Sequence, residues 1–277
     1  MFDLLVRGVL PPIIAALVLV SLGGARWLPL AVSIGCFAAY ALINKELPAW
    51  PHELWSASNG TEWLLWATIA AGVVAALERG RVLPARAGMP VAIALAAVGA
   101  WLVLDKVAQH WATGDFVLHV GVAVVAAAVL VATHRVVLAR APATPLPAVL
   151  FTVVLSVDGA IVTLGQSALL GQMTGAVAAA LGAAVGTTLW RRGFALGAAD
   201  GTWLGLTHGL SVLAAVHLAY LPWGAAGLAL AAPLPLLIVQ RGLAARPWRW
   251  LALAAPLVLV PLGAAVWLAV DDGGYGY

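Results

Sequence analysis

Asp158 is the one acidic residue deep inside a long apolar stretch of the sequence, which covers residues 147–165. The stretch is long enough to cross a membrane as a helix, and a charge in the hydrocarbon region costs several kcal/mol unless it is paired or hydrated. Two interpretations follow from the residue type. Asp158 is either a proton- or cation-coupling site, or a protonated or hydrogen-bonded side chain that holds helices together.

Three other polar residues lie in apolar surroundings where they could assist such a site. Gln166 and Gln172 surround the predicted break between two helices, about 12 Å of helix rise from Asp158. They would either line an outward-facing cavity or satisfy backbone groups that are left free where the helices end. His208 lies in a later apolar stretch and is predicted to be a polar neighbour of Asp158.

The sequence gives little support for metal or enzyme chemistry. His208 and His217 are nine residues apart and therefore point to opposite faces of a straight helix, so they do not form a metal-binding pair. Cys36 is the single cysteine, which excludes an intramolecular disulfide and a cysteine metal cluster. The usual zinc-protease, serine-hydrolase, phosphate-loop and Cys-x-x-Cys motifs do not occur. We expect no metal and no cofactor, and an intramembrane enzyme, which would need several polar side chains converging on one cavity, is the least supported hypothesis.

A run of small residues predicts a close helix contact. Gly171, Gly175, Gly182 and Gly186 recur at helical spacing and so share one face of the predicted helix at 170–190. Small residues let helices approach closely in a membrane, where apolar side chains are already satisfied by lipid. This face would pack against an internal neighbour or against a second subunit.

The helices that must position these residues are read from composition and from apolar runs. Of the 277 residues, 64% are hydrophobic and 9% are charged, which is too few charges for a water-soluble surface. We predict an all-α, polytopic transmembrane bundle of about ten helices, within a range of 8–10, forming a single membrane domain over residues 1–277. The predicted spans are 7–24, 28–44, 62–78, 90–106, 116–138, 147–165, 170–190, 203–221, 224–240 and 248–270.

The basic residues predict the direction of these spans, because they accumulate in cytoplasmic connections. With ten spans, both termini face outward, in a multi-pass protein of the cell inner (plasma) membrane. The first stretch is interpreted as an uncleaved span, with a signal peptide as the alternative. Eleven of the 14 Lys and Arg residues fall in alternate connections: Arg26, Arg79, Arg81, Arg86, Arg135, Arg140, Arg191, Arg192, Arg241, Arg246 and Arg249.

A Pro-rich connector at 141–147 divides the predicted helices into two groups of five, in halves 1–141 and 147–277. Five helices in each half would give the halves opposite directions, as in an inverted repeat. No internal sequence similarity accompanies this pattern, so duplication is a hypothesis drawn from the helix count.

One segment carries a resemblance to known proteins. The run Ser167-Ala168-Leu169-Leu170-Gly171-Gln172, followed by Gly175, Ala178, Ala179 and Gly182, resembles a segment of uncharacterised bacterial multi-pass membrane proteins. The resemblance implies a multi-pass membrane protein and supplies no activity. The ten-helix architecture is also similar to that of drug/metabolite-type permeases, but their termini are cytoplasmic, opposite to the charge pattern here.

These observations support two functional hypotheses. The first is a small secondary transporter or permease that uses Asp158 as a coupling or binding group. The second is a noncatalytic membrane subunit or scaffold, whose glycine face holds a membrane-protein partner or a second copy of the chain. The lipid bilayer is the expected surrounding of either, and a net charge of only +3 without basic runs gives no support for nucleic-acid binding.

Overall fold

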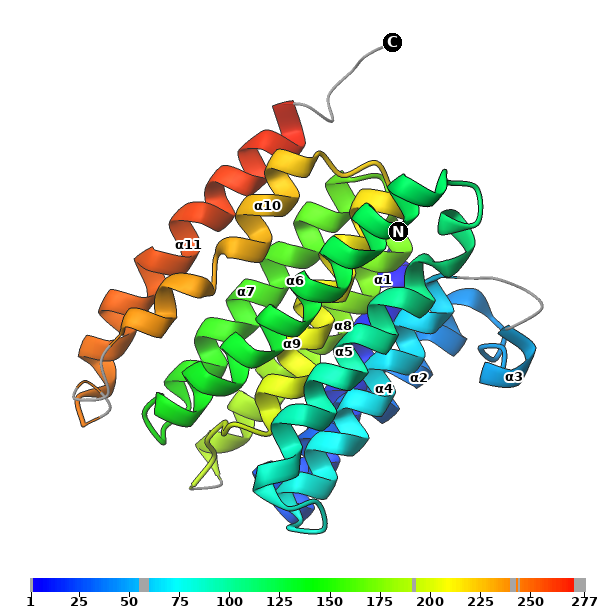
Figure 1. Cartoon of the computed structure of the whole chain (residues 1–277). Coiled ribbons are helices and arrows are strands. Elements are labelled where there is room, and N and C mark those ends of the chain that lie inside the picture. Colours follow the sequence, from blue (N-terminus) through cyan, green and yellow to red (C-terminus); the bar gives the residue numbers. More distant parts are fainter. Residues whose placement is uncertain (1, 55–59, 191–192, 240–242, 244, 272–277) are drawn as a thin grey trace.

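The chain folds into a bundle of long helices that run side by side (Figure 1). The computed structural model describes residues 2–54, 60–190, 193–239, 243 and 245–271, and within these ranges it contains no strand. The helices are α1 (Phe2–Gly23), η1 (Ala25–Trp27), α2 (Leu28–Asn44), α3 (Pro51–Leu54), α4 (Gly60–Arg79), α5 (Ala85–Ala108), α6 (Thr113–Arg140), α7 (Leu146–Leu164), α8 (Ala168–Gly186), η2 (Thr187–Leu189), α9 (Asp200–Leu218), α10 (Trp223–Ala231), η3 (Leu234–Ile238) and α11 (Pro247–Asp271).

Eight helical segments in the described part of the chain are long and apolar enough to cross a membrane. They include α1, α2, α4, α5, α6, α7, α8 and α11, and they confirm the predicted all-helical membrane architecture. The other two predicted spans, at 203–221 and 224–240, are not both long and apolar enough to be counted among these eight. The helix α9 has the length but is less apolar, and α10 with η3 forms only a shorter apolar segment, Trp223–Ile238.

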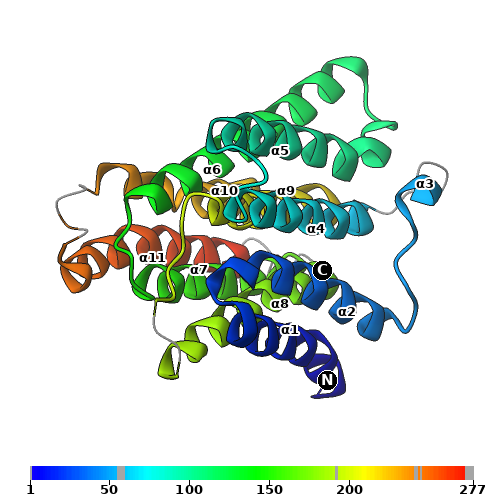
Figure 2. The same ribbon diagram turned by 90° about the horizontal axis from the view of Figure 1, so that it is seen from below.

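The reduced apolarity of α9 follows from its central position. Every residue from Asp200 to Ala215 is buried, and α9 packs against α4, α5, α6, α7, α8 and α10. Figure 2 shows α9 between the α5–α6 layer and the layer formed by α7 and α8. A helix that is enclosed by other helices does not need lipid-compatible side chains on all sides, so α9 tolerates polar residues along its length.

Proline interrupts the segment after α9. The α-helix α10 ends at Ala231, and the chain continues from Leu234 as the 3-10 helix η3. Pro233 stands at this junction, where its ring and its missing N–H prevent an α-helix from continuing. As a result, the carbonyl oxygen of Ala229 has no backbone N–H four residues ahead to accept from, and its backbone bond is a 3.2 Å contact from the N–H of Ala232.

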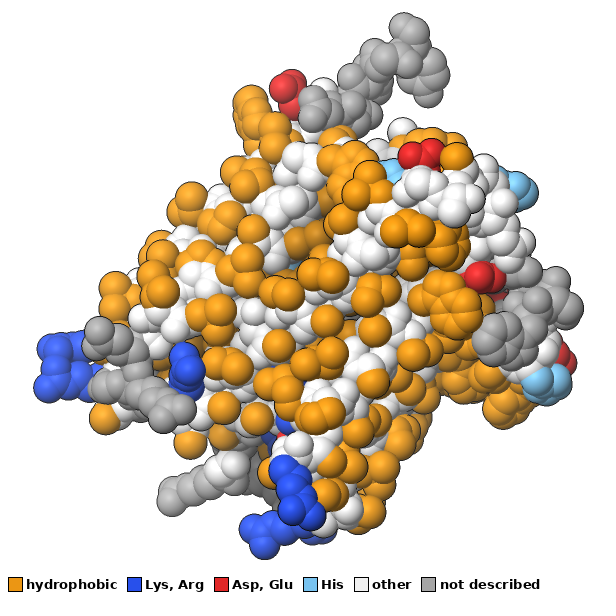
Figure 3. All heavy atoms as spheres, viewed as in Figure 1, with side chains coloured by type: hydrophobic (Ala, Val, Ile, Leu, Met, Phe, Trp, Pro, Cys, Tyr) orange, Lys and Arg blue, Asp and Glu red, His pale blue; other side chains and the backbone are white. Residues whose placement is uncertain are grey.

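The surface of the bundle separates by side-chain type. Figure 3 shows Lys and Arg at one end of the molecule, Asp and Glu at the opposite end, and a hydrophobic belt between them. On α1, for example, Leu10, Ile14 and Val18 are 47–51% exposed and are spaced by four residues, so they form one outward apolar stripe. This distribution is typical of a protein surrounded by lipid.

The first helix is an integral part of the bundle. It packs against both α2 and α8, so the two sequence halves, 1–141 and 147–277, are in direct contact. The turn into α2 is made by Gly24, which has a φ of 77°, followed by the 3-10 turn η1. The helix contacts agree with the interpretation of the first stretch as a span, whereas duplication of the halves stays a prediction.

Candidate functional site

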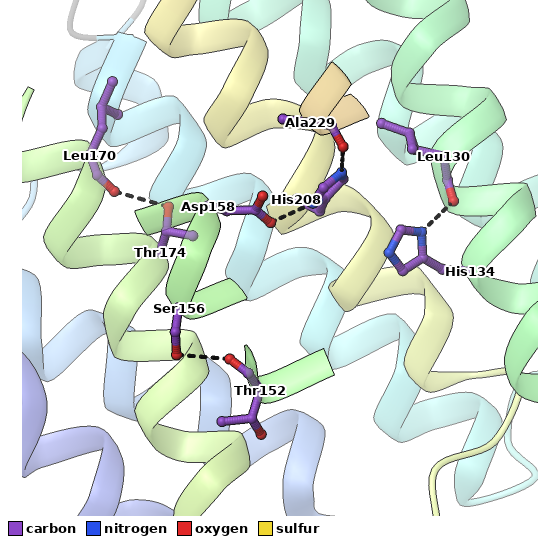
Figure 4. Close-up of polar contacts among 9 residues, drawn as sticks. All are labelled: Leu130, His134, Thr152, Ser156, Asp158, Leu170, Thr174, His208 and Ala229. Carbon is purple, nitrogen blue, oxygen red and sulfur yellow. Dashed lines mark hydrogen bonds and ion pairs between the residues drawn. The ribbon is translucent and has the colours of Figure 1, made fainter. Parts of the chain in front are cut away.

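Asp158 and His208 form a buried pair near the middle of their helices (Figure 4). The side chains come from α7 and α9, and both are 0% exposed. The distance between His208 Nδ1 and Asp158 Oδ2 is 2.5 Å, which is a short hydrogen bond. The structure therefore brings together two of the four residues that the sequence analysis selected for binding or coupling.

The second ring nitrogen of His208 determines where the protons of this pair lie. His208 Nε2 is 3.1 Å from the carbonyl oxygen of Ala229 in α10. A carbonyl oxygen only accepts hydrogen bonds, so Nε2 must carry a proton. A second proton lies between Nδ1 and the Asp158 carboxyl, and the pair has no net charge whichever of the two groups holds it.

Local sequence explains why the Ala229 carbonyl is available for this bond. In an uninterrupted helix it would accept from the N–H of residue 233, but that residue is Pro233. His208 supplies a donor to this carbonyl in the interior of the bundle. The proline four residues after Ala229 is the sequence signal for this contact, and sequence reasoning missed it.

A third polar side chain, His134, lies beside the pair. It comes from α6, is 1% exposed, and its Nδ1 lies 2.8 Å from the Leu130 carbonyl oxygen, to which it donates. Its ring centre is 5.5 Å from that of His208. The carboxyl oxygen Oδ1 of Asp158 has no protein hydrogen-bond partner, so the buried site has unused accepting capacity. Sequence spacing gave no signal that His134 and His208 are neighbours.

Gln166 and Gln172, the other two selected residues, do not join this pair. Gln166 is exposed in the turn between α7 and α8, where it has a φ of 69°. Gln172 is half-buried on α8 and lines a groove of about 490 Å³ between α1, α7 and α8. The structure thus places them on the outside of the bundle, away from the buried face on which Asp158 meets His208.

The predicted glycine face of α8 packs partly against α7. A Cβ at Gly171 would lie 2.7 Å from the Gly159 carbonyl oxygen, and one at Gly182 would lie 3.3 Å from a Thr152 methyl group. At Gly175 and Gly186 a Cβ would meet nothing within 4 Å. The neighbour of the first two glycines is therefore internal to the chain, one of the two alternatives that the sequence left open.

A second glycine series, which sequence reasoning missed, forms the contact between α6 and α9. Gly201, Gly205 and Gly209 are spaced by four residues along α9. A Cβ at Gly201 would lie 2.4 Å from the Arg135 backbone nitrogen, and one at Gly205 would lie 2.7 Å from the Val131 Cα. This backbone contact sets the distance between the helices that carry His134 and His208.

Two ion pairs join α4, α6 and α9 at the end of the bundle where the Lys and Arg side chains gather, which we call the arginine-rich end. Both guanidinium Nη atoms of Arg135 are 2.8 Å from the carboxylate of Glu78, and Nη1 also donates to Thr202 Oγ1 at 2.6 Å. Arg79 pairs with Asp200. These residues come from α4, α6 and α9, and their pairing depends on helix contacts that the sequence does not reveal.

Four aromatic rings gather at the opposite end of α9. The rings of His119 and His217 each lie 5.1–5.7 Å, centre to centre, from those of Trp111 and Trp223 and 5.4 Å from each other, and the four residues come from four separate segments. In the part of the chain that the structure describes, no three His, Cys, Asp or Glu side chains are arranged to hold a metal ion.

Comparisons of the chain with protein-family models, curated proteins and solved structures found no match.

Proposed function

We propose that the chain is a small secondary transporter, or permease, of the cell inner (plasma) membrane, and that Asp158 and His208 form its proton-coupling site. The observation that carries this proposal is the fully buried carboxyl–imidazole pair between α7 and α9. Ionisable residues in the interior of a membrane bundle are costly and commonly belong to ion or proton pathways.

The chemistry of the pair explains how it would couple to movement. With its shared proton the pair is neutral; gain of a further proton makes it cationic, and loss of the shared proton makes it anionic. A net charge in a low-dielectric interior is expensive unless the surroundings rearrange. Because the two groups lie on different helices, protonation changes the free energy of holding α7 and α9 together.

The proposed membrane arrangement has ten spans, with α9 and the α10–η3 segment completing the eight apolar helices. Both termini lie outside the cytoplasm, and the arginine-rich end lies inside. The central, enclosed position of α9 supports its inclusion as a span. The separation of basic and acidic side chains in Figure 3 supports the direction.

Cysteine labelling tests this topology. In a Cys36→Ala background, a cysteine at Asp115 in α6 is expected to react with a membrane-impermeant maleimide in intact cells. A cysteine at Arg81 or Arg140 is expected to react only after permeabilisation. Both basic positions lie at the arginine-rich end, and Arg81 and Asp115 are exposed. Labelling of Arg81→Cys in intact cells, with protection of Asp115→Cys, would reverse the proposed orientation.

The substitution Asp158→Asn tests the coupling role, because asparagine keeps the shape and removes the titratable proton. In liposomes that contain purified protein and an ultrafiltered extract of small solutes, we expect the variant to abolish pH-driven proton uptake, measured with an enclosed pH-sensitive dye. Folded yield should stay close to that of the unmodified chain. Asp115→Asn, at an exposed aspartate, serves as the control and should retain uptake.

Infrared spectroscopy reports the same group without a substrate. A pH step should give a carboxyl band from the buried site that is absent in Asp158→Asn and shifted in His208→Gln. Uptake that survives Asp158→Asn would contradict the coupling role. A large loss of folded protein in that variant, with a stoichiometric partner in native purifications and no flux in the unmodified chain, would favour a membrane scaffold instead.

A further inference from the structure

A small cavity lined by hydroxyl groups lies inside the bundle between α2, α4, α8 and α9. Its volume is about 10 Å³, and four hydroxyl-bearing side chains contribute to its wall, together with apolar side chains and Cys36. The four are Thr68, Thr174, Thr207 and Ser211, and each is at most 3% exposed. The cavity is separate from the groove that Gln172 lines.

The four hydroxyls divide into two kinds. Thr68 and Thr174 donate their protons to carbonyl oxygens of their own helices, those of Leu64 and Leu170, each at 3.0 Å. Their oxygens therefore keep lone pairs that can accept. The hydroxyls of Thr207 and Ser211 are buried and have no protein partner, so both of their protons are uncommitted.

We propose that this cavity is a binding site for one water molecule, which bridges α4, α8 and α9. Water donates twice and accepts twice, so one molecule can donate to Thr68 and Thr174 and accept from Thr207 and Ser211. The volume agrees, because a single buried water needs about 10–15 Å³ of this kind of space and two to four polar partners.

Other guests match the wall less well. A metal cation would accept all four oxygens as ligands but would leave the protons of Thr207 and Ser211 without acceptors. The wall also contains no carboxylate to balance its charge. An apolar molecule in the cavity would leave both uncommitted hydroxyls unpaired, which is unfavourable for buried donors.

The site lies close to the Asp158–His208 pair. A Cβ at Gly159 in α7 would lie 3.4 Å from the backbone nitrogen of Gly175 in α8, so the preceding residues, Asp158 and Thr174, come from the same stretch of helix contact. Figure 4 shows Asp158 between Thr174 and His208. The water would therefore hydrate the wall of the bundle beside the pair, and this inference is independent of the transport proposal.

The substitution Thr207→Val tests the site, because valine has nearly the same shape and lacks the hydroxyl. If water occupies the site, the variant loses one of four hydrogen bonds, and the melting temperature of the detergent-purified protein should fall by about 2–4 °C. If the site is dry, the same change removes an unpaired buried hydroxyl and should raise the melting temperature. A rise would overturn the proposal.

A double-mutant cycle with Ser211→Ala strengthens the test. Two residues that hold one water should be coupled, so the double variant should lose less than the sum of the single losses. Strictly additive effects would contradict a shared water. Thr187→Val is the control for removal of a buried threonine hydroxyl that does not line the cavity. Thr187 is buried, and its hydroxyl already donates to the Ala184 carbonyl at 2.7 Å, so its effect should simply add to that of Ser211→Ala. Density within hydrogen-bonding distance of Thr207 and Ser211 in a high-resolution experimental map supports the site, and its absence there rejects it.

Discussion

Replacing Glu78 with alanine is expected to destabilise the protein by about 3–5 kcal/mol, which corresponds to a fall of roughly 10 °C in the melting temperature. The carboxylate of Glu78 is 2.8 Å from both Nη atoms of Arg135, and the two side chains are 10% and 4% exposed. Arg135 Nε already has no partner. Removing Glu78 would leave a buried guanidinium without a counter-charge, and intrinsic tryptophan fluorescence during heating would measure the loss.

The double substitution Glu78→Leu with Arg135→Met separates this mechanism from a general loss of packing. Replacing both members of a buried ion pair with apolar residues is often nearly neutral, so the double variant should recover most of the stability. Arg86→Ala is the control at the same end of the bundle, because Arg86 is exposed and its replacement should change stability by less than about 0.5 kcal/mol. A Glu78→Ala variant as stable as Arg86→Ala would show that the pair contributes nothing.

The membrane helices were the part of the fold most accessible to sequence reasoning, because an apolar run long enough to cross lipid needs no partner to be recognised. The two less certain spans differ for physical reasons. The helix α9 is shielded by six others, so selection for apolar side chains is relaxed along it. The α10–η3 segment is divided at Pro233, which shortens the α-helical part.

The site was only partly predictable. Asp158 stood out because a lone carboxyl in an apolar span is costly, and His208 was predicted as its neighbour; the structure supplies the bond between them. Gln166 and Gln172 could not be placed by sequence spacing, since the rotation of α8 about its axis decides whether Gln172 faces the interior or the groove. Helix rotation and tertiary register are not encoded in a local pattern.

Polar residues follow α9 from one end of the bundle to the other, and each contacts a different part of the surroundings. Asp200 pairs with Arg79, His208 with Asp158, and His217 joins the aromatic rings at the far end. Thr207 and Ser211 line the hydroxyl cavity. The central helix α9 therefore provides many of the buried polar contacts of this bundle. The helix contacts that set the distance between α9 and its neighbours also set the geometry of the Asp158–His208 site.

Gly205→Ala is expected to destabilise the protein by about 1–3 kcal/mol and to disturb the site, although only one methyl group is added. That methyl would lie 2.7 Å from the Val131 Cα and 2.9 Å from the Leu130 carbonyl oxygen, both backbone atoms of α6. Backbone atoms cannot relieve the clash by a change of rotamer, as a side chain can, so α6 and α9 must move apart. The same movement would lengthen the 5.5 Å separation of the His134 and His208 rings. Thermal unfolding measures the first effect, and the infrared band of the Asp158 carboxyl reports the second.

Gly121→Ala on α6 is the matched control, because a Cβ at Gly121 meets nothing within 4 Å. Alanine is the better helix former by up to about 1 kcal/mol, so this variant should be unchanged or slightly more stable. Gly175→Ala and Gly186→Ala should behave like the control, since their Cβ positions are also open. Gly205→Ala with the stability of Gly121→Ala would mean that the α6–α9 contact is loose. Destabilisation confined to Gly205 among these variants would instead show that the α6–α9 contact is tight and holds the polar centre together.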